Sequence, residues 1–401
     1  MELIFFIDNE RQIGGGEYAQ FKFAENLANI GHKVIIFCGD KTFLSDELDK
    51  QKNLTIHYKK TIPVMLKKVG IGKTNAVIDK LYTKKIIEPT LKKIIKQSYE
   101  QKDTKNKKYL QKKQNENIWL IGYLRKSAIK AEMLGKKYNL EVANFIFESP
   151  PWMKEQLGEN EWNNEWSSSS FRKSWEKTGY AYTNSTILIP NSNLAGKKCK
   201  EWLPQARISE PVYPGIDSSN IYSDKKNKQK TPSRDIDIIY VGRLNSLKNI
   251  DEFLFSITPK EKVVIVGQGE EKRNLIRISK ENNLNIDFKG AVSEKEKWNL
   301  LSRSKLLIFP TSFEGFGMPP MEGLISGCQV LCSNIPILKE IYKNNVHYFK
   351  IHDIKDMKKM INFLLKKEVT QKKIPINFIK KFSWENSAKT IEKILKQNSL
   401  K

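Results

Sequence analysis

Short apolar runs, each followed by a turn and a helical pattern, recur along both halves of this chain. In the second half such runs stand at residues 237–241, 263–266, 286–288, 306–309 and 329–332. In the first half, Leu3–Ile7 is followed by an amphipathic pattern and then by a second run, Val34–Cys38. Apolar strands that alternate with helices indicate βαβ units and parallel sheets. We therefore predict an α/β chain, and its 401 residues suit two doubly wound, Rossmann-like domains.

The segment Thr311–Leu324, TSFEGFGMPPMEGL, is the most informative part of the chain for function. Its Pro-Pro pair at 319–320 suits the first turn of a helix, where the missing proline N–H would be unsatisfied anyway. Backbone N–H groups around Phe316 to Met318 would then converge at the positive end of the helix dipole. The carboxylates of Glu314 and Glu322 stand beside this expected anion site. A phosphate ligand that also carries sugar hydroxyls would suit both features.

The pattern from Phe313 to Glu322 resembles the signature of family-four glycosyltransferases, which are retaining enzymes with the two-domain GT-B fold. The resemblance implies that Glu314 contacts the sugar of a nucleotide-diphosphate donor and that Glu322 holds the ribose hydroxyls. It also implies that four residues bind the donor through backbone groups: Gly315, Phe316, Gly317 and Met318. The alternative is an ordinary helix start whose acidic residues complement the dipole.

A second resemblance lies at residues 240–249, YVGRLNSLKN, which look like the family's strand-then-Gly-Arg-x4-Lys element. In the family this arginine and lysine bind the donor diphosphate, which implies catalytic roles for Arg243 and Lys248. Phosphoryl oxygens favour a bidentate guanidinium and a point-charge ammonium. Preorganised cations also stabilise the charge that builds on a leaving diphosphate. In a chain with 70 Lys and Arg residues, two solvated basic residues are the alternative.

Glycine-bearing turns are expected to line the nucleotide site. Gly267 stands in VVIVGQGE, where the family places a glycine turn, and we expect it to contact the nucleotide through its backbone. A triple glycine at 14–16 precedes the first helix, and in the family this loop faces the donor phosphates and the acceptor. The resemblance thus implies binding roles for Gly15 and Gly16, with a flexible surface turn as the alternative. GIGKT at 70–74 is not a phosphate loop, because position 67 is lysine instead of glycine.

The chain departs from the family at the end of the expected strand 143–147. Many relatives carry a histidine in the amino-terminal domain that contacts the donor sugar, whereas here Glu148 precedes a Pro-Pro pair. Two interpretations of Glu148 stay open. It contacts sugar or acceptor, or it is only a carboxylate at a strand end before a Pro-Pro turn.

We predict three parts along the chain. Residues 1–212 form an N-terminal Rossmann-like acceptor-side domain with a basic helical insert at about 59–117. Residues 213–380 form a C-terminal Rossmann-like nucleotide-sugar-binding domain, and residues 381–401 form a helix that crosses back to the first domain. The join is placed at Val212–Asp217, before the Lys-rich stretch Tyr222–Arg234. The GT-B resemblance implies that the two domains face each other across a cleft.

The basic insert carries about half of the net charge. Residues 59–113 hold 17 lysines and four acidic residues, a net charge of +13 against +25 for the whole chain. An apolar helical stripe, kinked or broken at Pro89, is expected at Val77, Leu81, Ile87, Leu91 and Ile95. Residues 98–117 predict a frayed helix or a mobile loop. Such a segment suits an anionic membrane surface, and a solvated lysine-rich face is the alternative.

Nucleic-acid binding is the main alternative class that the charge raises. The chain has no recognition helix, aromatic stacking array or zinc motif, and its arginines are few beside its lysines. We therefore predict no nucleic-acid partner. A basic membrane- or nucleic-acid-binding protein on a degenerate GT-B scaffold remains the alternative function. Two other kinds of GT-B enzyme fit the sequence less well. An epimerase would show a histidine-rich cleft and a phosphorylase would show a pyridoxal-phosphate lysine motif, and the sequence contains neither.

No metal and no cofactor are expected beside the donor substrate. The four histidines have no ligand spacing, and no Asp-x-Asp stands near the expected diphosphate. The four cysteines should be buried free thiols: Cys38, Cys199, Cys328 and Cys332. With no 18-residue apolar run and no leader expected, we predict a cytoplasmic hexosyltransferase, peripheral at the inner face of the membrane. Its acceptor would be a glycan or a lipid-linked glycan in cell-envelope or polysaccharide synthesis.

Overall fold

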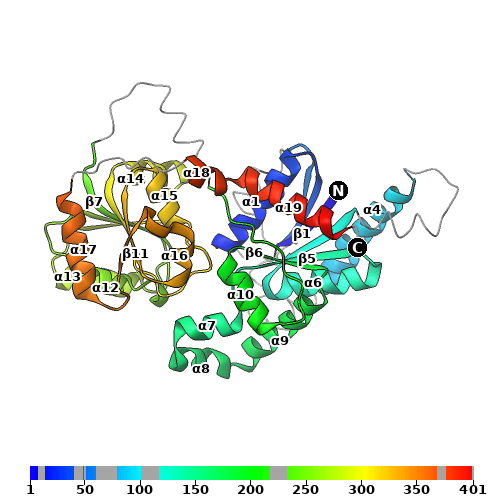
Figure 1. The fold of residues 1–401 in the computed structure, drawn as a ribbon, viewed down its shortest axis with the longest axis horizontal. Helices are drawn as coiled ribbons and strands as arrows, with labels where there is room; N and C mark the ends of the chain where they lie inside the picture. The colour runs from blue at the N-terminus through cyan, green and yellow to red at the C-terminus, as the bar shows by residue number, and fades with distance from the viewer. Residues whose placement is uncertain are drawn as a thin grey trace, which may run out of the picture. The chain divides into compact units, whose positions relative to one another are not determined.

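The structure is a computed structural model, and it describes residues 1–7, 14–39, 48, 51–59, 79–100, 117–216, 233–367 and 376–399. The chain divides into two compact units. Figure 1 shows the chain coloured by residue number from the N-terminus to the C-terminus. The first unit comprises residues 1–150, 163–213 and 384–401, and the second comprises residues 151–162 and 214–383. The change of unit thus lies between Tyr213 and Pro214. Asp217 and most of the Lys-rich stretch after it lie outside the described residues.

The first unit is built on a parallel sheet with the strand order β3-β2-β1-β4-β5-β6. Its strands are β1 (Glu2–Ile7), β2 (Lys33–Cys38), β3 (Leu54–Tyr58), β4 (Ile118–Tyr123), β5 (Glu141–Ile146) and β6 (Ile187–Pro190). The central strands are apolar on both faces because helices cover both faces of the sheet. Strand order reverses between β1 and β4, and doubly wound folds bind ligands at the carboxyl ends of strands at such a point.

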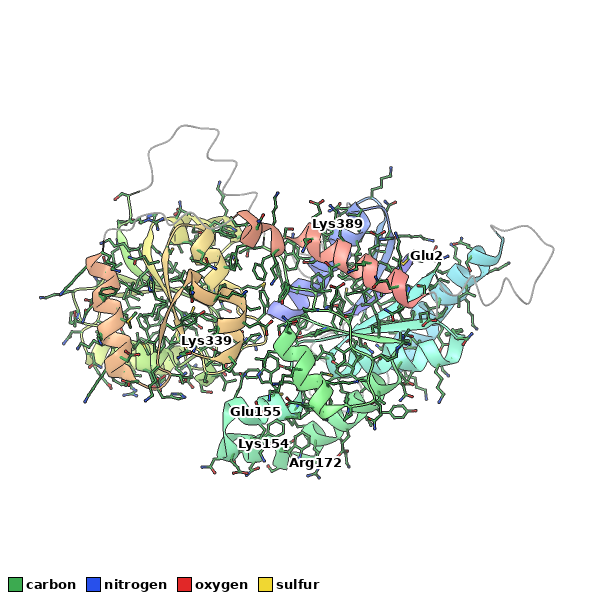
Figure 2. The ribbon with its side chains drawn as sticks, in the orientation of Figure 1. Glu2, Lys154, Glu155, Arg172, Lys339 and Lys389 are labelled. Atoms are coloured by element: carbon green, nitrogen blue, oxygen red, sulfur yellow. The ribbon has the colours of Figure 1, made fainter. Side chains whose placement is uncertain are left out.

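Helices cover each face of this first sheet. They are α1 (Gly15–Asn29), the π-helix η2 (Thr83–Ile87), α4 (Glu88–Glu100), α6 (Leu124–Tyr138), α9 (Ser169–Asn184), α10 (Asn193–Trp202) and α19 (Trp384–Asn398). Helices η2, α4 and α6 contribute to one apolar cluster on the sheet. Helix α19 contacts α1, and Trp384 packs edge-on against Phe23, which itself stacks on Phe145 of β5. Lys389 marks α19 in Figure 2.

Helices α7 (Pro150–Leu157) and α8 (Glu159–Ser167) follow β5 and precede α9. The Pro-Pro pair after Glu148 is therefore a helix start, where the sequence analysis placed a turn. Proline is favoured in the first helical turn, which explains the difference.

The apolar stripe predicted in the basic insert is only partly right. Ile87 and Leu91 are buried against the sheet as predicted, but Leu81 is 48% exposed and Ile94 lies deeper in the core than Ile95. A π-helical turn at η2 adds a residue and rotates the stripe, which explains the shift. Pro89 lies in the first turn of α4 and does not break the helix. Val77 and residues 101–116 lie outside the described residues.

The second unit holds another six-stranded parallel sheet, with the order β12-β11-β10-β7-β8-β9. Its strands are β7 (Ile236–Val241), β8 (Val263–Val266), β9 (Ile286–Gly290), β10 (Ser304–Phe309), β11 (Gln329–Ser333) and β12 (His347–Phe349). The five predicted strands are present. The sixth, β12, has only three residues and no apolar run long enough to announce it. Here strand order reverses between β7 and β10.

Two layers of helices cover the second sheet (Figure 1). Helices α12 (Ile250–Phe255), α13 (Lys272–Glu281) and α17 (Ile354–Lys366) share one apolar core with the sheet. Helices α14 (Glu294–Ser302), α15 (Pro319–Ile325) and α16 (Pro336–Tyr342) lie on the opposite face, and Lys339 marks α16 in Figure 2. The short elements are η4 (Ser246–Lys248), η5 (Lys343–Asn345) and α18 (Ile376–Lys381).

The four cysteines are buried and free, as the sequence predicted. Burial raises the pKa of the Cys199 thiol to about 12 and that of Cys328 to about 11. Among the described helices, none combines the length and the apolar character that crossing a bilayer requires.

Candidate functional site

The strand-order reversal of the second sheet brings two predicted residues into contact. Lys248 ends η4, after β7, and Glu314 stands in the loop after β10. The Lys248 Nζ atom lies 2.5 Å from Glu314 Oε1, and the two side chains are 15% and 18% exposed. Asn249, in the left-handed conformation at φ 45°, ties the loops together because its Nδ2 donates to Pro310 O at 2.9 Å. The site is thus held by the loops that follow the two central strands.

Lys248 has further partners that the sequence analysis did not include. Its ammonium also donates to Thr311 Oγ1 at 3.2 Å and to Phe313 O at 3.1 Å. With Glu314, these acceptors match the three hydrogens that a lysine ammonium carries. Thr311 also donates to Phe313 O at 2.8 Å, so it orders the loop that carries Glu314. Its position next to the glutamate motif is the only sequence signal that could have singled it out.

The predicted helix start is present, with Met318 as the N-cap of α15 and Glu322 in the first turn. The Gly317 carbonyl accepts a hydrogen bond from the Tyr342 hydroxyl of α16, which holds the turn in place. Within the part of the chain that the structure describes, the N–H groups of Gly317 and Met318 donate to no protein group. The Phe316 ring is buried and packs edge-on against Phe382. The Phe316 ring therefore belongs to the core, and ligand binding by the Phe316 backbone stays a prediction.

Glu322 has a basic partner that the sequence did not indicate. Lys297 of α14 places its Nζ 2.7 Å from Glu322 Oε1 and 3.0 Å from the Glu294 carboxylate. The side chains of Lys297 and Glu322 are 14% and 12% exposed. One lysine among many on a charged helix carries no sequence signal of this contact.

Arg243 follows β7 and Gly242 at the same edge of the sheet, and its side chain is exposed. Its carbonyl accepts a hydrogen bond from Tyr240 Oη at 2.8 Å, which fixes its backbone. Among the described residues, no hydrogen bond or ion pair involves its guanidinium. The structure therefore leaves this cation available, whereas Lys248 is fully engaged.

Gly267 lies at the end of β8 in a backbone conformation that favours glycine, with φ +146°. Its N–H donates to Gly290 O at 2.8 Å, and a Cβ built at this position would lie 1.8 Å from Gly242 O. The close approach of the turns after β7 and β8 thus accounts for the glycine. The nucleotide contact of Gly267 stays a prediction.

In the first unit, Gly15 and Gly16 form the first turn of α1, with Gly14 as the N-cap. The expectation of a glycine loop before the helix is therefore wrong for these two residues. The Tyr123 hydroxyl of β4 approaches Gly16 so closely that a Cβ there would lie 2.1 Å from it. This contact joins the start of α1 to the end of β4, the strand at which order reverses.

Glu148, after β5, belongs to a charged group near the same edge of the first sheet. Burial raises the pKa of Glu148, the nearby Glu17 raises it further, and Arg125 opposes both. Burial also raises the pKa of Tyr123, with contributions from Glu148 and Glu17. Glu148 was a candidate from the sequence, whereas Tyr123 and Arg125 form no motif that could have indicated them.

The turn from β4 into α6 is strained. Leu124 and Arg125 have φ values of 42° and 37°, which cost energy for residues with side chains. The Arg125 guanidinium lies 5.9 Å from the Phe171 ring and 6.0 Å from the Trp175 ring of α9. Backbone strain of this kind is typical of functional sites, and it supports a binding role for this edge.

Comparison with known proteins finds one matching family and several relatives. Residues 222–382 match the family described as glycosyl transferases group 1. The O-antigen biosynthesis glycosyltransferase WclY of Escherichia coli is 30% identical over 171 residues, which are 41% of this chain and 47% of that protein. The serotype-specific mannosyltransferase WbdA of Escherichia coli is 27% identical over 178 residues, 41% of this chain and 22% of that protein. The chain thus spans less than half the length of either relative.

Among solved structures, Anabaena Alr3699/HepE in complex with UDP resembles the whole chain. It has a TM-score of 0.66 at 13% identity, and the match covers 99% of this chain and 100% of that one. Together with the two parallel sheets, this likeness establishes the two-domain, Rossmann-like GT-B fold. The similarity of this chain to the glycosyl transferases of group 1 thus lies in residues 222–382, within the second unit.

Proposed function

We propose that this chain is a retaining glycosyltransferase, which transfers a sugar from a nucleotide-diphosphate donor to a glycan or lipid-linked acceptor in polysaccharide synthesis. The observation that carries the proposal is the Lys248–Glu314 ion pair beside the start of α15, at the strand-order reversal. Cations, unpaired backbone N–H groups and carboxylates gathered there suit a ligand that is both anionic and rich in hydroxyls. The O-antigen glycosyltransferase among the relatives supports the assignment.

The engaged state of Lys248 suggests how the donor is received. An arriving diphosphate replaces Glu314 as a partner of the ammonium, because it brings more negative charge than one carboxylate. Glu314 is then released to accept hydrogen bonds from the sugar hydroxyls. Arg243 supplies a second, bidentate cation from the neighbouring loop. Diphosphate binding and sugar binding are thereby linked through one ion pair.

The chemical step breaks the bond between the sugar C1 and the diphosphate oxygen and forms a bond from C1 to the acceptor oxygen. Negative charge builds on the leaving diphosphate, and Arg243 and Lys248 stabilise it more than the ground state. The acceptor hydroxyl proton passes to the leaving phosphate oxygen as the acceptor attacks on the same face. These two cations neutralise the diphosphate, so we expect no requirement for a metal ion. A product with inverted anomeric configuration, read by NMR, would contradict the retaining assignment.

A thermal-shift panel with UDP, GDP, ADP and CMP, together with their common sugar conjugates, tests this proposal. A ligand that binds only the folded state raises the melting temperature with its concentration relative to Kd. We expect a clear shift with at least one nucleoside diphosphate and its sugar conjugate. Arg243→Ala should lose most of that shift, while Arg277→Ala, an exposed control on α13, should keep it.

The alternative class has its own outcome in the same experiment. A folded protein whose melting temperature responds to none of these nucleotides would contradict donor binding. The basic surface would then support a membrane- or nucleic-acid-binding protein on a degenerate scaffold.

We further propose that the described part of the basic insert holds the enzyme at the inner face of the membrane. Leu81 and Ile86 are 48% and 40% exposed, and exposed lysines surround them on η2 and α4. Apolar side chains among lysines suit an anionic bilayer, where each lysine near the surface adds roughly 1 kcal/mol. A lipid-linked acceptor would lie on the same surface.

Vesicle sedimentation tests this localisation. The protein should bind phosphatidylglycerol-containing vesicles at low salt and release at high salt, since salt screens the lysine contacts. The double variant Leu81→Ser/Ile86→Ser should bind more weakly. Met133→Ser removes a 62% exposed apolar side chain from α6 and should bind like the wild type. Equal binding to vesicles of phosphatidylcholine alone would contradict the proposal.

A further inference from the structure

Lys297 is a cation whose burial the proposed roles of the other residues do not explain. It lies on α14, where Ser293 caps the helix start by accepting from Glu296 N at 3.2 Å and Trp298 is buried. The Lys297 Nζ lies 5.5 Å from the Trp298 ring centroid and 2.7 Å from Glu322 Oε1. By contrast Lys295, on the same helix, is exposed.

Lys297 keeps its positive charge although its side chain is largely buried. Burial by itself lowers the pKa of Lys297, but the Glu322 and Glu294 carboxylates raise it above its ordinary value. A cation that is mostly removed from water costs free energy unless its partners are well placed. Here the partner is the carboxylate to which the family resemblance assigns the ribose. Lys297 therefore acts on the donor site through Glu322.

The geometry leaves Glu322 able to bind a diol. Oε1 is engaged by Lys297, and among the described residues Oε2 has no hydrogen-bond partner. A carboxylate oxygen accepts more than one hydrogen bond, so both oxygens retain capacity for a ligand. Because Lys297 holds one oxygen, the carboxylate cannot turn freely about its last torsion. Two adjacent hydroxyls can then meet two oxygens whose positions are already fixed.

We propose that Lys297 is a positioning residue of the nucleotide site, which fixes the Glu322 carboxylate for both ribose hydroxyls and so selects ribonucleotides over 2′-deoxyribonucleotides. The inference rests on the proposed function and adds to it a determinant of donor selectivity. Without the lysine, the Glu322 carboxylate turns toward water, and it no longer presents two ordered acceptors. Selectivity for the ribose is then the property that changes first.

Calorimetric titration of the full chain with UDP, GDP and their 2′-deoxy forms tests this inference. We expect the wild type to bind the better ribonucleotide about tenfold or more tightly than its 2′-deoxy form, as a lost hydrogen bond to a charged group implies. Lys297→Met, which keeps the side-chain length, should reduce that ratio below about threefold. Lys297→Arg keeps the charge and should restore most of the selectivity. Lys295→Met should match the wild type.

The outcomes separate this inference from the proposed function. A wild type that binds none of the nucleotides contradicts the proposed function itself. A wild type that binds ribo- and deoxyribonucleotides equally, or a Lys297→Met variant that keeps the wild-type ratio, overturns the inference alone. A purely structural ion pair would lower the melting temperature without changing the ratio. If Lys297→Met does not fold, Lys297→Gln keeps a donor near Glu322, and its ratio should fall between those of the wild type and a site without selectivity.

Discussion

Replacing Lys248 by alanine should lower the rate of sugar transfer by about 10²–10³-fold, the effect of losing one preorganised group that stabilises transition-state charge. Lys248 is the cation that meets Glu314 at the strand-order reversal, and no second lysine contacts Glu314 among the residues that the structure describes. The loss should fall mainly on kcat, because the charge on the diphosphate is greatest as it leaves. Initial rates with the sugar nucleotide that the thermal-shift panel identifies measure this effect.

Two further variants separate loss of the charge from disorder of the loop. Lys260→Ala removes an exposed lysine of the same unit and should leave the rate unchanged. Lys248→Ala also leaves the Glu314 carboxylate without its cation, which disturbs the loop. The double variant Lys248→Ala/Glu314→Ala removes that unpaired charge, so it should recover thermal stability but not activity. Recovery of activity in the double variant would show that Lys248 serves only the fold.

The second unit was largely predictable from the sequence because its site is built from short contiguous motifs. Glu314, Arg243 and Lys248 each follow a strong apolar run, and parallel strands bring their carboxyl ends to one edge of a sheet. The contact between Lys248 and Glu314 follows from that topology. What the sequence did not predict is that Lys248 is fully engaged before any ligand binds.

Side-chain contacts between separate elements were the part that sequence reasoning could not reach. Lys297 meets Glu322 only because α14 and α15 pack on the same face of the sheet, and helix packing leaves no motif in a lysine-rich chain. In the first unit the same limit applies to Tyr123, whose hydroxyl touches Gly16 across the start of α1. The strained turn at Arg125 could not be predicted either, because positive φ angles at ordinary residues have no sequence signature.

Regular periodicity also failed where the helix itself is irregular. The stripe predicted for the basic insert assumed 3.6 residues per turn, and η2 breaks that period at Thr83–Ile87. Leu81 therefore points to solvent although the pattern placed it in the core. The same irregularity produces the exposed apolar residues on which the proposed membrane contact depends.

Gly267→Ala should destabilise the second unit by about 3–5 kcal/mol, through backbone strain and a steric clash that act together. The new Cβ would lie 1.8 Å from the Gly242 carbonyl oxygen, a backbone atom that cannot move without disturbing the turn after β7. The Gly242 N–H donates to Val266 O at 3.0 Å. If Gly242 moved to relieve the clash with the new Cβ, this hydrogen bond would break. A fall of about 10 °C in melting temperature should be seen by calorimetry.

Gly31→Ala provides the matched control, since Gly31 has φ +98° but nothing lies within 4 Å of a Cβ built there. It should show the cost of the backbone conformation alone, about 1–2 kcal/mol. Because the turn of Gly267 is joined to that of Gly242, next to Arg243, the Gly267→Ala variant should also lose nucleotide-induced stabilisation even below its own melting temperature. Equal melting temperatures for the two variants would mean that the turns after β7 and β8 can move apart at little cost in free energy. The precise placement of Arg243 would then have to come from the ligand instead of the fold.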